Sequence, residues 1–238
     1  MSHLFIFDLD GTLINITDQQ VAATNLDYRT ALGITLEDNV VLDKFGMGEW
    51  ETHEAIFNEL NLPYQGEERN RRIQQIIDQH PKSFREVLDP IPYISPLEEV
   101  VDFLSYLRKN NENLALATGN MQEPAEILLE KSGLKSFFQI VSYSDGIKSK
   151  RETIEYAIRQ ATDKNLQFRR VVFFDDTSKG VSAGRYVGAL VPTLVVGVAT
   201  GLKGSDSAES LVKAGADIVI SSFRDYRKIY ANIIDRLK

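Results

Sequence analysis

Short apolar runs recur along the chain, and longer segments of helical periodicity separate them. The runs are rich in Val, Ile and Phe and are bounded by polar or glycine residues, as is typical of buried strands. We expect strands at Leu4–Phe7, Leu114–Ala117, Gln139–Ser142, Val171–Phe174, Thr193–Val196 and Asp217–Ile220. Apolar residues at helical spacing predict helices at Pro96–Lys109, Glu123–Ser132 and Lys150–Ala161. This alternation favours an α/β fold with a doubly wound parallel sheet, covered by helices on both faces.

One interval interrupts the alternation, between the first and the second predicted strand. A connection between parallel strands needs only about 30 residues, and this interval is several times longer. Most of the excess has a helical pattern, in Asp18–Leu32, Glu49–Leu60 and Glu67–Gln79. We therefore predict an all-helical cap inserted into an α/β core, with the cap at residues 16–91 and the core at residues 1–15 and 92–238.

Composition narrows the classes of partner. The 238 residues carry a formal net charge of −7, which does not indicate the basic surface that binding to nucleic acid requires. No segment approaches the roughly 20 apolar residues of a membrane span, and the first residues lack the basic lead of a signal peptide. The chain has no cysteine, which excludes disulfides and thiolate metal sites. We expect a soluble cytoplasmic protein that binds neither nucleic acid nor membrane, and the sequence leaves its oligomeric state open.

Two carboxylates stand where the first predicted strand ends. Asp8 and Asp10 are two positions apart, so an extended backbone places them on the same side. Gly11 allows the chain to turn directly after them. Ligands of an open parallel sheet collect at the carboxyl ends of its strands. Two carboxylates there repel each other unless a cation or a proton intervenes, and Mg²⁺ prefers hard oxygen ligands and accompanies phosphates.

Polar residues also follow other predicted strands. A hydroxyl group and a flexible backbone next to a helix start suit phosphate oxygens, two further carboxylates end the fourth strand, and a lysine before a helix can balance the negative charge. These residues are Thr118, Gly119 and Asn120, then Asp175 and Asp176, and a lysine within Lys148–Lys150. Because the carboxyl ends of parallel strands share one edge, we expect these groups to meet.

Together these motifs resemble those of the haloacid dehalogenase (HAD)-like hydrolase superfamily, in particular its phosphoglycolate phosphatase and β-phosphoglucomutase-like branch. The resemblance spans nearly the whole chain and implies a Rossmann-like core with a helical cap. It implies that Asp8 is the nucleophile and Asp10 the general acid and base, whose main-chain carbonyl contacts the metal. It further implies a phosphate site formed by Thr118, Gly119, Asn120 and Lys150, and a Mg²⁺ site formed by Asp8, Asp10, Asp175 and Asp176.

The last motif departs from the pattern common in the superfamily. Many relatives have glycine followed by aspartate, with a second aspartate four residues later. Here Asp175 stands at the glycine position and Gly180 stands where the second aspartate would fall. Which of Asp175 and Asp176 ligates the metal therefore stays open, and Lys148 remains an alternative to Lys150.

The function that we expect is hydrolysis of a small phosphorylated metabolite by a Mg²⁺-dependent phosphatase, through an aspartyl-phosphate at Asp8. The alternatives are a phosphosugar mutase of the same superfamily, or a receiver-like or phosphate-binding module with weakened catalysis. The resemblance implies that the segment Gly46–Trp50 lies near the active site, and we expect Trp50 to be a packing residue. The histidines lack the spacing of metal ligands, so we expect ordinary surface or core roles for His3, His53 and His80.

Overall fold

The computed structural model describes residues 2–145 and 149–238. Within these residues one six-stranded sheet has the order β3-β2-β1-β4-β5-β6, and every pairing in it is parallel. The strands are β1 (Leu4–Phe7), β2 (Asn113–Ala117), β3 (Ile140–Ser142), β4 (Val171–Asp175), β5 (Thr193–Val198) and β6 (Ile218–Ile220). Each of them overlaps a predicted strand, and the predicted fold class is confirmed.

Strand β1 lies at the centre of the sheet, where the strand order reverses. The chain adds β2 and β3 on one side of β1 and then returns to add β4, β5 and β6 on the other. Phe7, the last residue of β1, is in register with Leu116 of β2 and with Phe174 of β4. The residues that follow these three strands therefore meet at one edge, at the position where open α/β sheets bind ligands.

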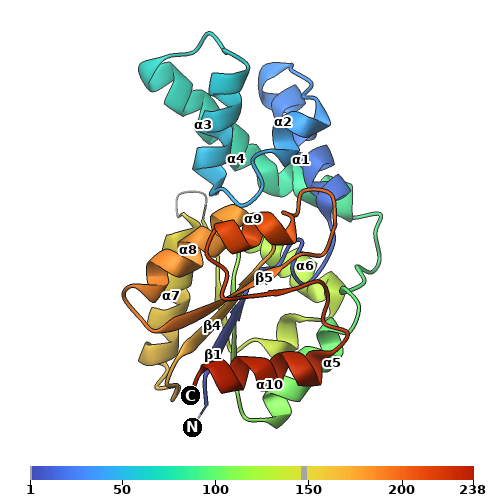
Figure 1. Cartoon of the computed structure of the whole chain (residues 1–238). Coiled ribbons are helices and arrows are strands. Elements are labelled where there is room, and N and C mark those ends of the chain that lie inside the picture. Colours follow the sequence, from blue (N-terminus) through green and yellow to red (C-terminus); the bar gives the residue numbers. More distant parts are fainter. Residues whose placement is uncertain (1, 146–148) are drawn as a thin grey trace.

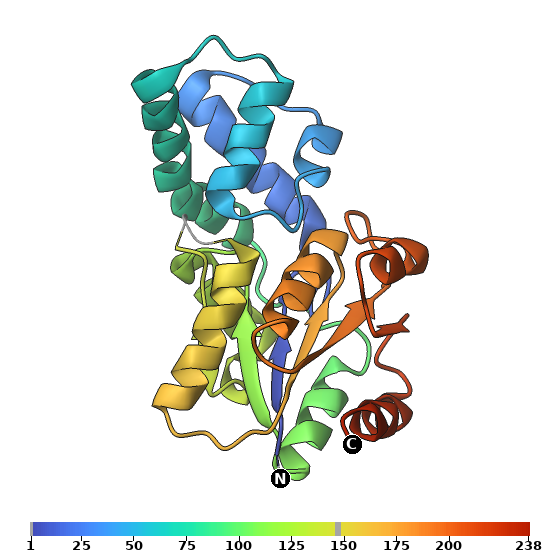
Figure 2. The same ribbon diagram turned by 60° about the vertical axis from the view of Figure 1, so that its left-hand side comes forward.

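Helices cover both faces of the sheet, as Figures 1 and 2 show. Phe5, Phe7 and Phe174 point to one face, which α5 (Val100–Lys109), α6 (Gln122–Ser132) and α10 (Tyr226–Arg236) cover. Ile6 and Phe173, one position out of phase, point to the other face, which α7 (Lys150–Asp163), α8 (Ser178–Gly188) and α9 (Ala208–Lys213) cover. Because strands buried on both faces need apolar residues throughout, their sequences read as continuous apolar runs.

Four helices lie together beyond the carboxyl ends of the strands, at the top of Figure 1. We call them the cap helices: α1 (Thr17–Leu32), α2 (Asp38–Leu42), α3 (Glu49–Glu59) and α4 (Gly66–Leu88). They bury an apolar cluster of their own that includes Tyr28, Phe57 and Ile76, and Trp50 packs against it. The residue limits of a separate cap domain remain a prediction.

Helix α4 is longer than the pattern predicted, because it continues through Pro81 to Leu88 instead of ending at Gln79. Proline inside a helix removes one hydrogen bond and crowds the preceding turn. Phe84 and Leu88 are nevertheless fully buried in the apolar cluster of the core, and this packing stabilises the extra turns. As a result, α4 contributes buried side chains both to the cap helices and to the core.

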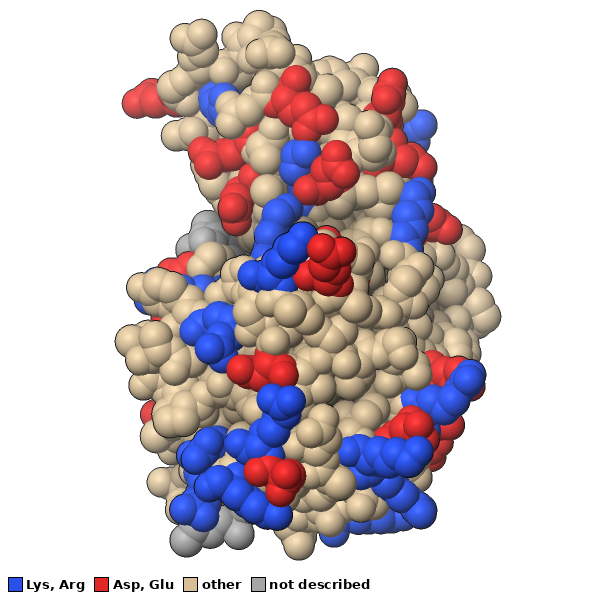
Figure 3. Space-filling view, in the orientation of Figure 1, with Lys and Arg blue, Asp and Glu red and all other residues tan. Residues whose placement is uncertain are grey.

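The ends of the chain and its charges are distributed unevenly. Both termini lie at the end of the sheet away from the cap helices (Figures 1 and 2). On the face in Figure 3, acidic side chains predominate over the cap helices, and basic ones gather toward the opposite end.

No helix in the described part of the chain combines the length and the apolar character that crossing a membrane requires.

Candidate active site

The central position of β1 brings Asp8 next to β4. The Asp8 N–H donates to the Phe174 carbonyl at 2.9 Å. The ammonium group of Lys150 donates to Asp8 Oδ1 and lies 3.2 Å from Asp175 Oδ2. Lys150 is the first residue of α7, where Ser149 and Glu152 form a capping box that fixes the helix start. A single buried cation thus joins carboxylates from two adjacent strands.

Asp175 is held in place by its own turn and by Gly180. Asp175 Oδ1 accepts hydrogen bonds from the Thr177 N–H at 2.9 Å and from the Thr177 hydroxyl at 2.8 Å. A Cβ atom on Gly180 would lie 2.1 Å from both carboxylate oxygens of Asp175. Asp175 and Gly180, the two departures from the common motif, therefore belong together. The Asp175 carboxylate fills the space that a side chain at position 180 would occupy.

Asp176 is fixed by two hydroxyl groups from other loops. Thr12 donates to Asp176 Oδ1 at 3.0 Å, and Ser205 donates to Asp176 Oδ2 at 2.5 Å. Gly11, with φ of +77°, lies so close that a Cβ atom there would be 2.1 Å from Asp176 Oδ2. The glycine of the first motif thus gives the backbone a positive φ and also leaves room for the Asp176 carboxylate.

Among the described residues, one group of carboxylates has the geometry of a metal site. Asp8, Asp175 and Asp176 each place an oxygen within 4.8 Å of the other two, and all three residues are buried. Burial raises the pKa of Asp8 to about 6 against the opposing effect of Lys150. Burial, followed by Asp175 and Asp8, raises the pKa of Asp176 well above its usual range. A hard divalent cation would relieve this repulsion, and the all-oxygen donor set fits Mg²⁺.

Asp10 has a different environment and lies outside this group of three carboxylates. Its Oδ2 accepts a hydrogen bond from the Asn120 amide, and Gln20 of α1 donates to Asn120 Oδ1 at 3.2 Å. Burial and the charge of Asp8 raise the pKa of Asp10 to about 7, against the lowering effect of Asn120. A carboxyl group with such a pKa can give or take a proton near neutral pH.

Three predicted phosphate-binding residues directly follow β2, and two of them line the cavity. Thr118 is fully buried, and its hydroxyl oxygen accepts from the Asn120 N–H and from the Asn120 side-chain amide, each at 3.1 Å. Gly119 and Asn120 line the cavity directly, whereas Thr118 lies behind them. Lys148, the alternative to Lys150, lies outside the described residues, while Lys150 lines the cavity beside Asp8.

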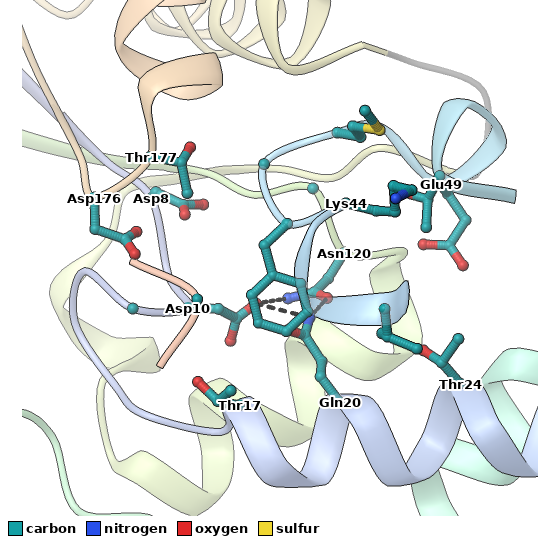
Figure 4. A pocket seen from close by; sticks show the side chains of 18 of the residues that line it. Asp8, Asp10, Thr17, Gln20, Thr24, Lys44, Glu49, Asn120, Asp176 and Thr177 are labelled. Carbon is teal, nitrogen blue, oxygen red and sulfur yellow. Dashed lines mark hydrogen bonds between the residues drawn. The ribbon is translucent and has the colours of Figure 1, made fainter. Parts of the chain in front are cut away.

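A cavity of about 100 Å³ lies between the strand ends and the cap helices. In Figure 4, Asp8, Asp176 and Thr177 gather at one end, and Lys44, Glu49 and Thr24 gather at the other. Asp10, Asn120 and Gln20 lie between these two groups. The cavity therefore has one end on the core and the other on the cap helices.

Some cavity residues were not singled out from the sequence. Gln20, His53 and His80 line the cavity, and the two histidines are buried, in keeping with the core role that was one of the two expected. Glu49 also lines the cavity, and it lies in the segment Gly46–Trp50 that was expected near the active site. Glu49 and His53 are four positions apart on one helix, which is a usable signal for neighbouring side chains. His80 pairs with Asp27 across 53 positions, and no sequence spacing indicates a contact between two packed helices.

Comparison with known proteins assigns the family. The family model described as "Haloacid dehalogenase-like hydrolase" matches residues 5–194. The chain belongs to this family. It is 26% identical to a phosphoglycolate phosphatase from Synechococcus elongatus, over 92% of this chain and 93% of the relative. Among solved structures, a hydrolase from Pseudomonas syringae matches with a TM-score of 0.74 and 22% identity, over 96% of this chain and 98% of that one. A β-phosphoglucomutase from Clostridium difficile matches with a TM-score of 0.73 and 20% identity, over 98% of this chain and 99% of that one.

These comparisons confirm the expected superfamily and branch, and with them the expectation of an enzyme of the phosphatase type. The similar solved structures confirm the Rossmann-like α/β fold. This haloacid dehalogenase-like hydrolase carries its family motifs on strand ends that the structure brings to one edge. The catalytic and ligand roles of the individual residues stay predictions.

Proposed function

We propose that this HAD-like hydrolase is a Mg²⁺-dependent phosphatase that transfers the phosphoryl group of a small phosphorylated metabolite to Asp8. The observation that carries the proposal is the meeting of Asp8, Asp10 and Lys150 in the lining of one small cavity. A nucleophile, a proton carrier and a cation are the groups that two-step phosphoryl transfer requires.

In the first step, a carboxylate oxygen of Asp8 attacks phosphorus, and the bond from phosphorus to the leaving oxygen breaks. Lys150 holds Asp8 Oδ1, which leaves the second oxygen to attack. Asp10, whose pKa is raised to about 7, gives its proton to the departing alkoxide. The products of this step are the free alcohol and an aspartyl-phosphate.

In the second step, water attacks the phosphorus of the aspartyl-phosphate and gives a proton to Asp10. Inorganic phosphate leaves, and both aspartates return to their starting state. Asn120 binds the Asp10 carboxylate, so the proton carrier keeps its position through both steps. The N–H groups around Gly119 would donate to the phosphoryl oxygens, and Thr118, expected in the phosphate site, would act there by holding Asn120, whose N–H and side-chain amide donate to its hydroxyl oxygen.

Asp8, Asp175 and Asp176 would hold the Mg²⁺ ion. When it is bound, the ion neutralises charge on the carboxylates and on the phosphoryl oxygens. We propose that Asp176 is a direct ligand and that Asp175 also orients Lys150, since Asp175 Oδ2 lies 3.2 Å from the Lys150 ammonium group.

The test is the release of inorganic phosphate from a generic aryl phosphate by the native protein and by Asp8→Asn. The native protein should turn over with Mg²⁺ and lose activity when EDTA removes the metal, and Asp8→Asn should be at least about 1,000-fold slower. Asp18→Asn, an exposed aspartate of α1, is the matched control. Equal phosphate release by native protein and Asp8→Asn would contradict the nucleophile assignment.

A panel of sugar phosphates separates hydrolysis from the mutase alternative. A phosphatase releases inorganic phosphate from these compounds, whereas a mutase converts one isomer into another without net release. The receiver-like alternative receives no support, because the chain belongs to a hydrolase family.

A further inference from the structure

The end of the cavity formed by the cap helices contains a buried polar network that the proposed phosphoryl chemistry does not use. His53 joins the Tyr28 hydroxyl to Glu49, with a distance of 3.2 Å on each side. Next to it, His80 Nδ1 lies 2.6 Å from Asp27 Oδ2. The side chain of Asp27 is fully buried, and its other oxygen has no hydrogen-bond partner among the described residues. Buried polar groups are usually hydrogen-bonded, and of this network Glu49, His53 and His80 line the cavity, whereas Tyr28 and Asp27 do not.

The residues of this network shift one another's pKa values and so set the charges of Glu49 and His80. Burial would raise the pKa of Glu49, but His80 and His53 outweigh it and lower the pKa to about 2. Burial would lower the pKa of His80, but Glu49 and Asp27 outweigh it and raise the pKa to about 9. Near neutral pH, therefore, Glu49 presents an acceptor and His80 a protonated ring.

The basic side chains that line the cavity have carboxylate partners within the described part of the chain. The pairs are Lys150 with Asp8, His80 with Asp27 at 2.6 Å, His53 with Glu49 at 3.2 Å, Lys44 with Glu59 at 2.5 Å, and Lys203 with Asp38 at 3.4 Å. Among the described residues, each basic side chain at the cap end of the cavity thus has a carboxylate partner, so a second anionic group of a substrate would compete with that carboxylate.

In contrast to these paired cations, the Glu49 carboxylate has an oxygen that can still accept a hydrogen bond. Glu49 uses Oε1 toward His53, and none of the hydrogen bonds among the described residues engages its Oε2. Thr24 and Thr52 add two hydroxyl groups to the lining. A ligand hydroxyl both donates and accepts. It can therefore donate to the Glu49 carboxylate and accept from a threonine hydroxyl or from the His80 ring. An ammonium group would face the charged His80 and Lys44, and a carboxylate would face Glu49.

We propose that Glu49, His80 and the adjacent threonines form a recognition site for the hydroxyl groups of a neutral leaving alcohol, so that the substrate is a phosphorylated polyol or sugar and not a phosphorylated acid. The inference rests on the proposed phosphatase function. It gives this chain a substrate class different from that named by its phosphoglycolate phosphatase relative.

The charge of the cap supports the same choice. Residues 16–91 contain 14 acidic and 7 basic residues, so their excess equals the whole net charge of −7. A substrate with a carboxylate in addition to its phosphate would approach this surface with one more negative charge. Juxtaposing like charges is the usual means by which a protein rejects a wrong partner.

The test compares two substrates of equal length that differ in one group. Glycerol 3-phosphate ends in CH₂OH, and 3-phosphoglycerate has a carboxylate in its place. We expect the native protein with Mg²⁺ to have a kcat/KM at least about 100-fold higher for the polyol phosphate, as for sites built to bind a substrate hydroxyl. We expect Glu49→Gln to reduce this ratio about tenfold or more, and Glu54→Gln, an exposed glutamate of the same helix, to leave it unchanged.

Binding to Asp8→Asn, measured by calorimetry, makes the two proposals separable. Tighter binding of glycerol 3-phosphate than of 3-phosphoglycerate supports the recognition site even if the native protein releases no phosphate, in which case only the phosphatase proposal fails. Equal or weaker binding of the polyol phosphate overturns the recognition site. A substrate ratio in Glu49→Gln equal to that in Glu54→Gln also overturns it, whatever the rate of hydrolysis.

Discussion

At the scale of single residues, Gly180 shows how the site constrains a position that does no chemistry. Its missing side chain leaves the space that the Asp175 carboxylate occupies. We expect Gly180→Ala to displace Asp175 from Lys150 and to lower kcat for an aryl phosphate about 100-fold, the usual cost of losing one preorganised charge contact. The measurement is steady-state kinetics with saturating Mg²⁺.

Gly188, in the same helix, is the matched control, because a Cβ atom there would meet its nearest neighbour at an ordinary 3.6 Å. Gly188→Ala should keep native kcat and stability. A Gly180→Ala protein with native kcat would show that the position of Asp175 does not matter for the reaction.

The site residues on strand ends could be predicted from the sequence because their geometry is simple. Asp8, Asp175 and Thr118 follow apolar runs, and parallel strands place all such positions at one edge. The resemblance assigned Lys150 to the site and the structure adds its contact with Asp8, but Lys148 lies outside the described residues, so the choice between the two lysines stays a prediction. The pair of Asp27 and His80 had no signal, because it depends on how two helices pack across a long separation in sequence.

At the scale of elements, that same pair links α1 to α4, and it makes stability depend on pH. The pKa of His80 rises from an ordinary value of 6.5 to about 9 in the folded protein, because Glu49 and Asp27 outweigh burial. Its contribution to the unfolding free energy is complete below pH 6.5. Between pH 6.5 and 9 the unfolded chain releases the proton first, so stability falls, by up to about 3 kcal/mol in total.

Chemical denaturation at several pH values with Mg²⁺ present measures this slope. We expect His80→Gln to be less stable at pH 6.5 and to lack the fall toward pH 9. His3→Gln, at the opposite end of the molecule, should keep it. A slope in His80→Gln equal to that of the native protein would assign the pH dependence to other groups.

The helices were predicted less completely than the strands, for reasons visible in their composition. Helix α8 contains Gly180, Gly184 and Gly188, and glycine is a poor helix former. It is held by packing, since Val181 and Val187 are buried against the sheet. Helix α4 continues through Pro81 for the same kind of reason. Tertiary burial overrode local propensity in both helices, and local patterns do not report tertiary burial.

At the scale of the whole molecule, the loop of residues 43–48 between α2 and α3 contacts the core and lines the cavity. Lys179 of α8 donates to the carbonyls of Asp43 at 3.1 Å and of Phe45 at 3.3 Å. Gly204 of the core lies against the Phe45 ring, at a distance that excludes a side chain. The loop thus meets the core through two of its carbonyl groups and the Phe45 ring, beside the cavity that Phe45 and Gly204 line.

Lys179→Met keeps the length of the side chain and removes both hydrogen bonds. Hydrogen bonds from a partly exposed cation contribute on the order of 1 kcal/mol, so we expect KM to rise about fivefold. Lys213→Met, an exposed lysine of α9, is the control and should leave KM unchanged. The loop contact is irrelevant to substrate binding if both variants show the native KM.

The central place of β1 has a consequence for how the protein is made. Its four apolar residues leave the ribosome before the other strands and can pair with β2 once residue 117 has also left it, but their other edge needs β4, which ends at Asp175. Until then, a growing chain carries an open strand edge of the kind that associates with other chains. Fragments that end before β4 should therefore aggregate, and translation that stalls in this interval should recruit chaperones.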